Sequence, residues 1–209
     1  MEEGVVAVNV ARTGKGVRKV KLPKITKVPT ILTPDEAAKS IEAAATLKQL
    51  KARGTDFSLM LAWLMFGLFG GLRTCETRRL QWEDIRLDEG QFYVSPSKND
   101  KPRWVAITSP LEHYLKQLLA TSRTGAVLLN RAEYTLQEHM TKLRKATGAE
   151  IPQNTLRHSF ASNHLVHFDN PANTATELGH HSPQVTFDFY RRAVTKAQAK
   201  AYWDLRASL

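Results

Sequence analysis

The sequence has little cysteine and no long apolar run, and both absences narrow the class of protein. Its one cysteine, Cys75, permits no internal disulfide, so we expect a reducing compartment. The longest apolar stretch, residues 59–72, is interrupted by glycines and is too short to span a bilayer. Residues 1–11 begin with two glutamates after Met1, unlike the basic start of a signal peptide. We therefore expect an intracellular protein that has no membrane partner.

Acidic residues are also scarce. The 209 residues include 30 Lys and Arg but only 20 Asp and Glu, which gives a formal net charge of +10 and a pI near 9.8. This excess favours a polyanionic partner such as nucleic acid over an acidic small molecule, although a merely basic soluble protein has the same composition. The apolar content of 42% is ordinary for a globular chain, so one compact domain with an arm is expected.

The arm is predicted over residues 1–29, which show no helical periodicity. Against two glutamates, this segment holds seven basic residues, namely Arg12, Lys15, Arg18, Lys19, Lys21, Lys24 and Lys27. Spaced cations on an extended segment suit the phosphate backbone of a nucleic acid, but a solvated tail has the same pattern. Both interpretations stay open, and residues 30–209 are expected to form the folded domain.

Apolar periodicity and turn residues predict a mainly α-helical fold with a small antiparallel β-sheet. Thr33-Pro34-Asp35-Glu36 offers an N-cap, a first-turn proline and a capping-box glutamate, which predicts a helix from Thr33 to about Ala52. Residues 57–70 are apolar nearly all round, as in a helix buried in the middle of a domain.

Strand periodicity appears only between residues 85 and 107. Residues 91–94 and 103–107 flank a turn at 97–102 and predict an antiparallel hairpin. The remaining pattern is helical, with a short helix expected at 74–80 and further helices near 111–121, 134–147, 154–166, 173–179 and 195–205.

Residue types that suit phosphodiester chemistry stand in particular settings. Tyr190 follows His180 by ten residues, Arg73 ends Gly71-Leu72-Arg73, and Arg157 lies within Leu156-Arg157-His158. A tyrosine has a pKa of about 10, so its attack on a phosphodiester needs a base or a strong positive field. Two guanidiniums and a histidine provide these without a metal. Together these residues predict a site that cleaves phosphodiesters.

These segments resemble, in order, the motifs of the catalytic domain of the tyrosine recombinases, that is, the phage integrases and their bacterial relatives. The resemblance runs from the helix at Thr33 to the C-terminus and implies that family's fold. It also implies cleavage and rejoining of DNA strands through a 3′-phosphotyrosine intermediate. The matching segments are Gly71-Leu72-Arg73-Thr74-Cys75-Glu76 with Leu80-Gln81-Trp82-Glu83-Asp84-Ile85, Lys98 in the hairpin turn, Asn154-Thr155-Leu156-Arg157-His158-Ser159-Phe160-Ala161, and Leu178-Gly179-His180 with Tyr190.

The resemblance also implies a role for each residue. Tyr190 would be the nucleophile, Arg73 and Arg157 would bind the phosphoryl oxygens, and Lys98 would protonate the leaving 5′-oxygen. His180 would complete the clamp or shuttle the phenolic proton. Glu76 would support them by orienting an arginine. Apart from the resemblance, Lys101 in the same turn as Lys98 is expected to contact DNA, although a charged hairpin tip is usually only solvated.

One position departs from the family's pattern. Asn154 stands three residues before Arg157, where the family usually has histidine. Asparagine cannot take up or release a proton at neutral pH, but its amide can donate a hydrogen bond to a phosphate oxygen. Asn154 also opens a predicted helix, where asparagine is a favoured N-cap. Capping and phosphate contact are both open interpretations.

The expected partners follow from the resemblance. They are double-stranded DNA, further copies of the chain in a tetramer on that DNA, and accessory DNA-bending proteins. Such a protein would work in the cytoplasm at the nucleoid and come from a bacterium or a phage. No cofactor and no metal are expected, because the sequence has neither a Gly-x-x-x-x-Gly-Lys loop nor an acidic metal cluster.

The segment after Tyr190 is predicted to form a terminal helix with an apolar stripe. This stripe either folds back on its own domain or docks on a neighbouring subunit, as in similar recombinases. Its members are Val194, Ala197, Ala201, Tyr202 and Leu205.

Two other functions compete with recombination. A type IB topoisomerase uses a similar set of tyrosine, arginine and lysine, although the small size and the Leu-Gly-His motif argue against it. A DNA-binding relative that has lost catalysis is the other alternative, and Asn154 is its only support.

Overall fold

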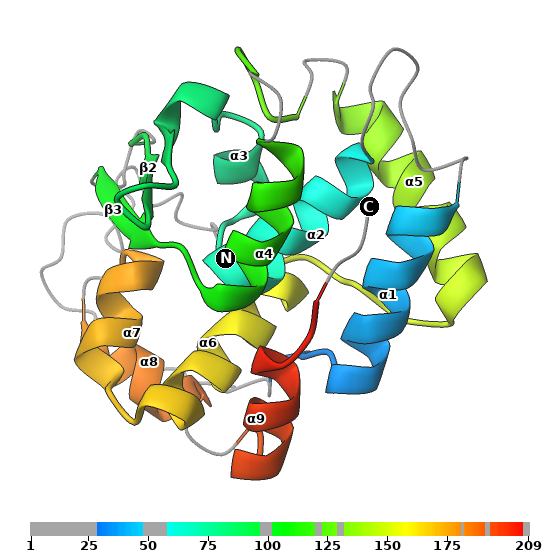
Figure 1. Ribbon diagram of the computed structural model, residues 1–209. Coiled ribbons are helices and arrows are strands. Elements are labelled where there is room, and N and C mark those ends of the chain that lie inside the picture. The colour runs from blue at the N-terminus through cyan, green and yellow to red at the C-terminus, as the bar shows by residue number, and fades with distance from the viewer. Residues whose placement is uncertain are drawn as a thin grey trace, which may run out of the picture.

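A computed structural model describes residues 29–47, 58–96, 102–119, 123–128, 132–180, 182–190 and 193–206. The described part is mainly helical and carries one small antiparallel sheet, as the sequence predicts (Figure 1). The sheet lies on one flank with α7 (Pro171–Leu178) and α8 (Pro183–Tyr190), and α1 (Pro34–Thr46) lies on the other with α5 (Ala132–Thr147). None of the helices in these ranges is long and apolar enough to cross a bilayer.

Helix α1 begins as predicted but ends earlier. Thr33 and Glu36 form the capping box, in which the Thr33 N–H donates to Glu36 Oε2 at 2.8 Å and the Glu36 N–H donates to Thr33 Oγ1 at 3.2 Å. The predicted end at Ala52 is wrong, because the helix stops at Thr46. Leu47 is extended, with φ −74° and ψ 109°, and packs partly buried against the core. Tertiary packing thus sets this end.

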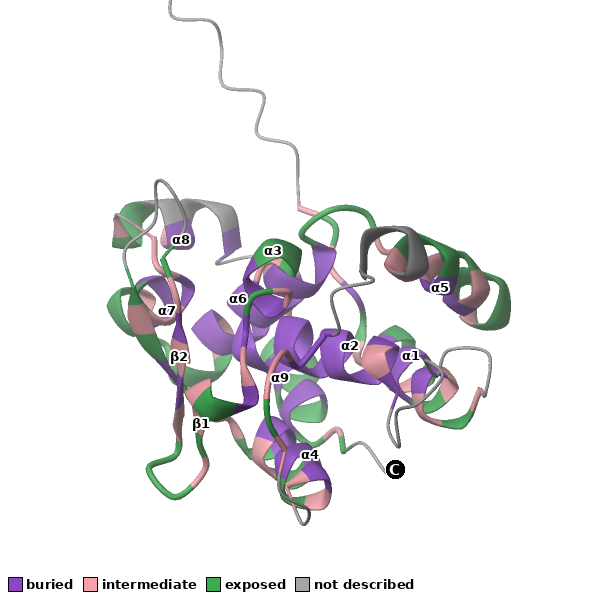
Figure 2. Cartoon of the chain, turned by 90° about the horizontal axis from the view of Figure 1, so that it is seen from above, coloured by how far each residue is buried: buried purple, intermediate pink, exposed green. Residues whose placement is uncertain are grey.

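Helix α2 (Leu59–Gly70) is the buried central helix that the apolar run predicts. Ser58 caps it by accepting the Leu61 N–H at 3.2 Å. Every residue from Met60 to Gly70 is buried, and Figure 2 shows this helix almost wholly in the colour of buried residues. It packs against α1, α4 (Ser109–Leu118) and α6 (Thr155–Phe168). Its C-terminal end is therefore fixed inside the domain.

The hairpin is confirmed, and a third strand extends it. β2 (Gln91–Val94) pairs antiparallel with β3 (Arg103–Ala106), with Phe92 opposite Val105. β1 (Ile85–Arg86) adds to the other side of β2. Two residues are too few to show a strand period, which is why the sequence does not reveal β1.

The segment between α2 and the sheet is less helical than expected. Helix α3 (Thr74–Thr77) ends three residues before the predicted Leu80. Leu80 instead accepts a hydrogen bond from the Val127 N–H at 2.9 Å, and Gln81 forms a bridge with Ala126. A single 3-10 turn, η2 (Trp82–Asp84), then leads into β1.

The remaining helices include one that the sequence analysis missed. α4, α5, α6, α7 and α9 (Lys196–Trp203) stand where helices are expected. Helix α8 was not predicted, because its sequence Pro-Gln-Val-Thr-Phe-Asp-Phe-Tyr is rich in β-branched and aromatic residues, which favour strands. Contacts with α6 and α7 stabilise it as a helix.

The terminal helix α9 folds back on its own domain. Tyr202 donates to the Leu68 carbonyl at 2.5 Å, and Trp203 Nε1 donates to the Asn163 carbonyl at 3.2 Å. The predicted stripe is wrong in part, because Ala197 and Ala201 are exposed. Tyr202 is buried as predicted, and Ala199 and Trp203 join it on the face that packs against α6 and α1.

Candidate active site

The first arginine segment is built around a sharp turn at the end of α2. Gly71 has φ +65°, and a Cβ there would lie 2.6 Å from Phe160 Cδ1, so only glycine fits. The turn puts Arg73 directly before α3, where its N–H donates to Glu76 Oε2 at 2.8 Å and its Nη1 to Glu76 Oε1 at 3.0 Å. The Arg73 side chain is 30% exposed and that of Glu76 only 1%, so Arg73 faces solvent from a buried anchor.

Arg103, at the start of β3, joins this anchor and was missed by the sequence analysis. It donates to both oxygens of Glu76, at 2.8 Å from Nη1 and 3.2 Å from Nη2, and its Nε donates to the Glu177 carbonyl at 2.9 Å. Its side chain is 8% exposed. The sequence shows Arg103 only as the first residue of a predicted strand. Strand periodicity cannot show that this residue pairs with Glu76.

Arg157 reaches the same place from α6 and is held more rigidly. Its Nη1 donates to the Gly71 carbonyl at 2.8 Å, its Nη2 donates to the Leu178 carbonyl, and Nη1 lies 3.7 Å from Glu76 Oε2. Burial and the charge of Arg73 lower the pKa of Arg157 to about 10, which leaves it charged at neutral pH. A guanidinium has more N–H donors than these carbonyls use, so Arg157 can still bind an anion.

Glu76 is the common partner of these guanidiniums. Burial raises the pKa of Glu76, but hydrogen bonds from Arg103 and Arg73 and the charges of Arg103 and Arg157 outweigh burial and bring the pKa below its ordinary value. Glu76 is thus ionised, and three guanidiniums share its one carboxylate. Glu76 therefore contacts the arginines that it was predicted to orient. Three positive charges around one carboxylate leave a net positive charge at this place.

His180 follows a second left-handed glycine, which ends α7. Gly179 has φ +67°, and a Cβ there would lie 3.2 Å from Arg103 Cδ. His180 Nδ1 lies 2.8 Å from the hydroxyl of the buried Thr186 in α8. Burial, followed by the charges of Arg157, Arg73 and Arg103, lowers the pKa of His180 to about 4. The ring is therefore neutral at pH 7 and lies within the field of the arginine cluster.

Tyr190 ends α8 and contacts a histidine that was not predicted as part of the site. Its hydroxyl lies 2.8 Å from Nδ1 of His158, the residue after Arg157. Burial raises the pKa of Tyr190, and the positive charges of Arg157 and Arg73 oppose that rise. Only the tertiary contact between α6 and α8 reveals His158, because His158 and Tyr190 lie 32 residues apart in the sequence.

Asn154 precedes α6 but does not cap it. Its backbone is left-handed, with φ 67° and ψ 2°, and its side chain makes no capping hydrogen bond. The N-cap interpretation is therefore wrong. Asparagine suits the position for another reason, since it tolerates the left-handed region better than most residues.

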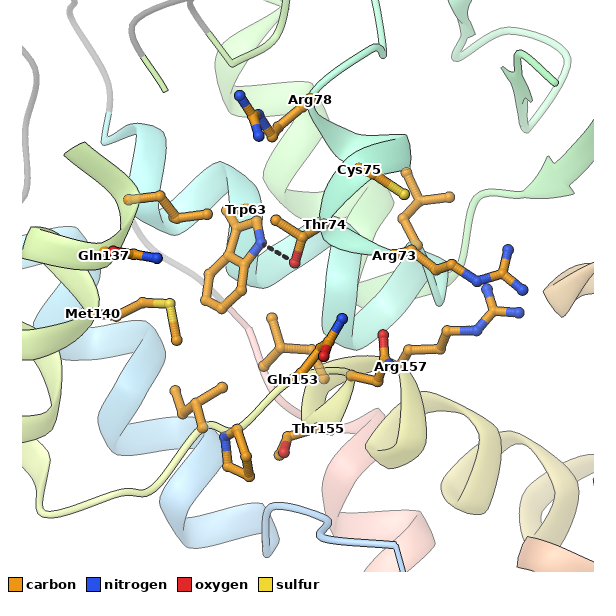
Figure 3. Close-up of a pocket in the computed structure, with 16 residues that line it drawn as sticks. Trp63, Arg73, Thr74, Cys75, Arg78, Gln137, Met140, Gln153, Thr155 and Arg157 are labelled. Atoms are coloured by element: carbon orange, nitrogen blue, oxygen red, sulfur yellow. Dashed lines mark hydrogen bonds between the residues drawn. The ribbon is translucent and has the colours of Figure 1, made fainter. Parts of the chain in front are cut away.

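Asn154 lines a pocket of about 510 Å³ together with Arg73 and Arg157. In Figure 3 the guanidinium groups of Arg73 and Arg157 lie next to each other at one side of this pocket. Trp63 also lines the pocket, away from these guanidiniums in that view, and donates from Nε1 to Thr74 Oγ1 at 3.3 Å. The pocket thus joins the paired arginines to a partly apolar space.

Several predicted residues lie outside the described ranges. They are Lys98 and Lys101 of the hairpin turn and the cations of the arm, Lys15, Arg18, Lys19, Lys21, Lys24 and Lys27. Of the other predicted residues, the structure brings Arg73, Glu76, Arg157, His180 and Tyr190 into one region, to which it adds Arg103 and His158. An excess of guanidinium beside a phenol and two neutral histidines suits the binding of a phosphodiester next to a nucleophile.

Comparison with known sequences places the chain in a family. Residues 30–196 match the sequence model of the phage integrase family. The chain is 29% identical over 189 residues to the tyrosine recombinase XerA of Pyrococcus horikoshii, which covers 85% of this chain and 62% of that protein. The chain thus spans less than two thirds of the length of the curated relatives it first matches.

Solved structures show the same fold. The crystal structure of XerA recombinase superimposes with a TM-score of 0.60 at 24% identity, covering 83% of this chain and 64% of that one. The catalytic domain of bacteriophage HP1 integrase gives a TM-score of 0.58 at 17% identity and covers 84% of this chain and 95% of that domain.

Proposed function

Since the chain belongs to the phage integrase family, we propose that it is a site-specific recombinase that cleaves and rejoins DNA strands. Tyr190 attacks the scissile phosphate and forms a 3′-phosphotyrosine ester, and a second DNA 5′-hydroxyl reverses the step on another strand. The observation that carries this proposal is the convergence of Arg73, Arg157 and Tyr190 from three distant parts of the chain.

The arginines stabilise the transition state in this proposal. Arg157 is already fixed by two carbonyls, and Arg73 is tethered through Glu76 with 30% of its side chain exposed. Each can donate to a non-bridging oxygen, and one such donor contributes about 3 kcal/mol to the transition state. Lys98 protonates the leaving 5′-oxygen, and Asn154 donates its amide to the phosphate from the exposed end of α6.

His180 acts beside the arginines as an uncharged hydrogen-bond donor to the phosphate. In this proposal the Thr186 hydroxyl donates to Nδ1, so the ring carries its proton on Nε2 and can donate it to a phosphoryl oxygen. Its pKa of about 4 keeps this state over the neutral range.

We further propose that residues 30–209 form the catalytic domain and that residues 1–29 are an arm that binds the DNA backbone. The support is the basic composition of the arm and the net charge of +10. Copies of the chain assemble as a tetramer on double-stranded DNA at the nucleoid, with bending proteins as accessories. Because α9 packs on its own domain, truncation after Val194 should destabilise the fold before it affects assembly.

A trapping experiment tests the function without knowledge of the target site. The whole chain is incubated with a library of nicked, randomised duplexes, and adducts that resist denaturation are captured and sequenced. We expect an enriched sequence whose 3′-phosphate is joined to Tyr190, and no adduct with Tyr190→Phe at unchanged DNA affinity. An adduct that persists in Tyr190→Phe would contradict the assignment of the nucleophile.

The same selected duplex separates the competing functions. Relaxation of a supercoiled plasmid that carries the duplex, without joining of partner strands, would indicate a topoisomerase. DNA binding without any adduct would indicate a relative that has lost catalysis.

A further inference from the structure

Two histidines lie in the region of the arginine cluster, and the structure gives them different partners. His180 Nδ1 faces the Thr186 hydroxyl at 2.8 Å. His158 Nδ1 instead faces the Tyr190 hydroxyl at 2.8 Å, with ring centroids 5.7 Å apart. The distance between His158 and the phenolic oxygen lies within the range over which a general base takes a proton.

We propose that His158 is a catalytic residue, the general base that accepts the phenolic proton of Tyr190 as its oxygen attacks the phosphorus. This inference rests on the proposed function, because it assigns a role within the same cleavage step. It differs from the expectation that His180 shuttles this proton.

The hydrogen bond decides which tautomer His158 must adopt. A phenol that donates to Nδ1 requires this nitrogen to be unprotonated, so the ring proton sits on Nε2. Burial, and then the charge of Arg157, lowers the pKa of His158 and favours the neutral ring. Among the described residues, the titratable and charged groups that act on or contact it are Arg157 on α6, His180 after α7 and Tyr190 on α8.

The proton and electron pairs balance in this step. The proton passes from Tyr190 Oη to His158 Nδ1 while the bond between Oη and phosphorus forms. The bond between phosphorus and the 5′-oxygen breaks, and this oxygen takes a proton from a separate donor, which the proposed function assigns to Lys98. In the rejoining step His158 returns its proton to the phenolate.

The other candidates for the general base are less suited to the role. Asn154 has no titratable group and an exposed side chain. His180 has Nδ1 occupied by Thr186 and lies in the field of Arg157, Arg73 and Arg103, so its protonation is disfavoured. Three arginines lower the pKa of His180, whereas only one of them, Arg157, lowers the pKa of His158. Protonation of His158 is therefore opposed by fewer positive charges.

The test compares the unaltered chain with His158→Gln on the selected duplex in single-turnover adduct formation. General-base catalysis contributes roughly 100-fold or more, so we expect a loss of about 100-fold in rate. In the unaltered chain the rate should rise with pH and level off once His158 is neutral. In His158→Gln it should keep rising into the alkaline range, because the phenol must ionise directly.

A second measurement separates a catalytic role from a structural one. Replacing Tyr190 by a fluorinated tyrosine lowers the phenol pKa, and this should speed His158→Gln more than the unaltered chain. A variant that is slow only because its site is distorted would gain nothing. The matched control is His167→Gln, an exposed histidine on the same helix, which should leave rate and pH profile unchanged.

The possible failures are distinguishable. If the unaltered chain forms no adduct, the proposed function falls and the role of His158 falls with it. If the unaltered chain forms the adduct and His158→Gln matches its rate and pH profile, only the role of His158 is overturned. Should His158→Gln lose its thermal transition, ¹⁵N NMR of the unaltered chain decides, because a proton on Nδ1 of His158 at neutral pH contradicts the proposal.

Discussion

Arg73 and Arg157 lie in the same site but differ in how far their side chains are buried. The Arg73 side chain is 30% exposed and donates from Nη1 to Glu76 Oε1 at 3.0 Å. The Arg157 side chain is 5% exposed and fixed by two backbone carbonyls. One arginine is thus part of the core and the other part of the surface. The difference teaches that the one role proposed for both arginines can rest on side chains that are buried to very different extents.

The largest expected effect is that of Arg157→Ala on stability. It leaves the Gly71 and Leu178 carbonyls without their donor in a buried place and removes a charge near Glu76, so we expect a loss of about 3 to 5 kcal/mol in the free energy of unfolding. Urea unfolding checks this, with Arg144→Ala at an exposed ion pair as the control. A loss below about 1 kcal/mol would show that Arg157 is no more structural than Arg73.

Glu76→Gln tests the group that the two arginines share. Its pKa is lowered in the fold, so its ionisation stabilises the protein above its unfolded pKa, and this stability is lost as the pH falls through the folded pKa. We expect about 2 to 3 kcal/mol less stability at pH 7 and a flatter acid limb, because the amide cannot ionise.

Urea unfolding between pH 3 and 7 measures both effects of Glu76→Gln. Glu112→Gln, at an exposed ion pair with Lys116, is the matched control and should differ little from the unaltered chain. An acid limb that is equally steep in Glu76→Gln would assign the pH dependence to other groups.

Arg73→Ala should separate catalysis from stability. The side chain is partly exposed, so its removal should cost about 1 kcal/mol or less in unfolding free energy. Adduct formation should slow by about 100- to 1000-fold, because one donor to the transition state is lost. Rates on the selected duplex beside urea unfolding give both values. If stability falls as far as in Arg157→Ala, the contrast between the two arginines is wrong.

The smallest effect is expected for Asn154→His. Histidine also tolerates a left-handed backbone better than most residues, so the cost should be about 1 kcal/mol or less. Cleavage should be equal or faster, because imidazole can donate a hydrogen bond and also carry a proton. Loss of adduct formation in a variant with an unchanged thermal transition would show that the amide itself is required.

Local patterns in the sequence were enough to predict much of this protein. The capping box at Thr33, the buried helix before Gly71 and the hairpin are confirmed, because each depends on neighbouring residues. The order of the motif segments along the chain also indicates the family, because that order can be read without knowing which segments are in contact.

The tertiary structure alone decided how the site is connected. Glu76 and Arg103 are 27 residues apart, and His158 and Tyr190 are 32 apart, so no local period reports either contact. Helix α8 follows packing against α6 and α7 rather than propensity, and the left-handed backbone of Asn154 replaces the expected cap. Side-chain types and spacing are properties of the sequence, whereas partners and burial arise only when distant segments pack together.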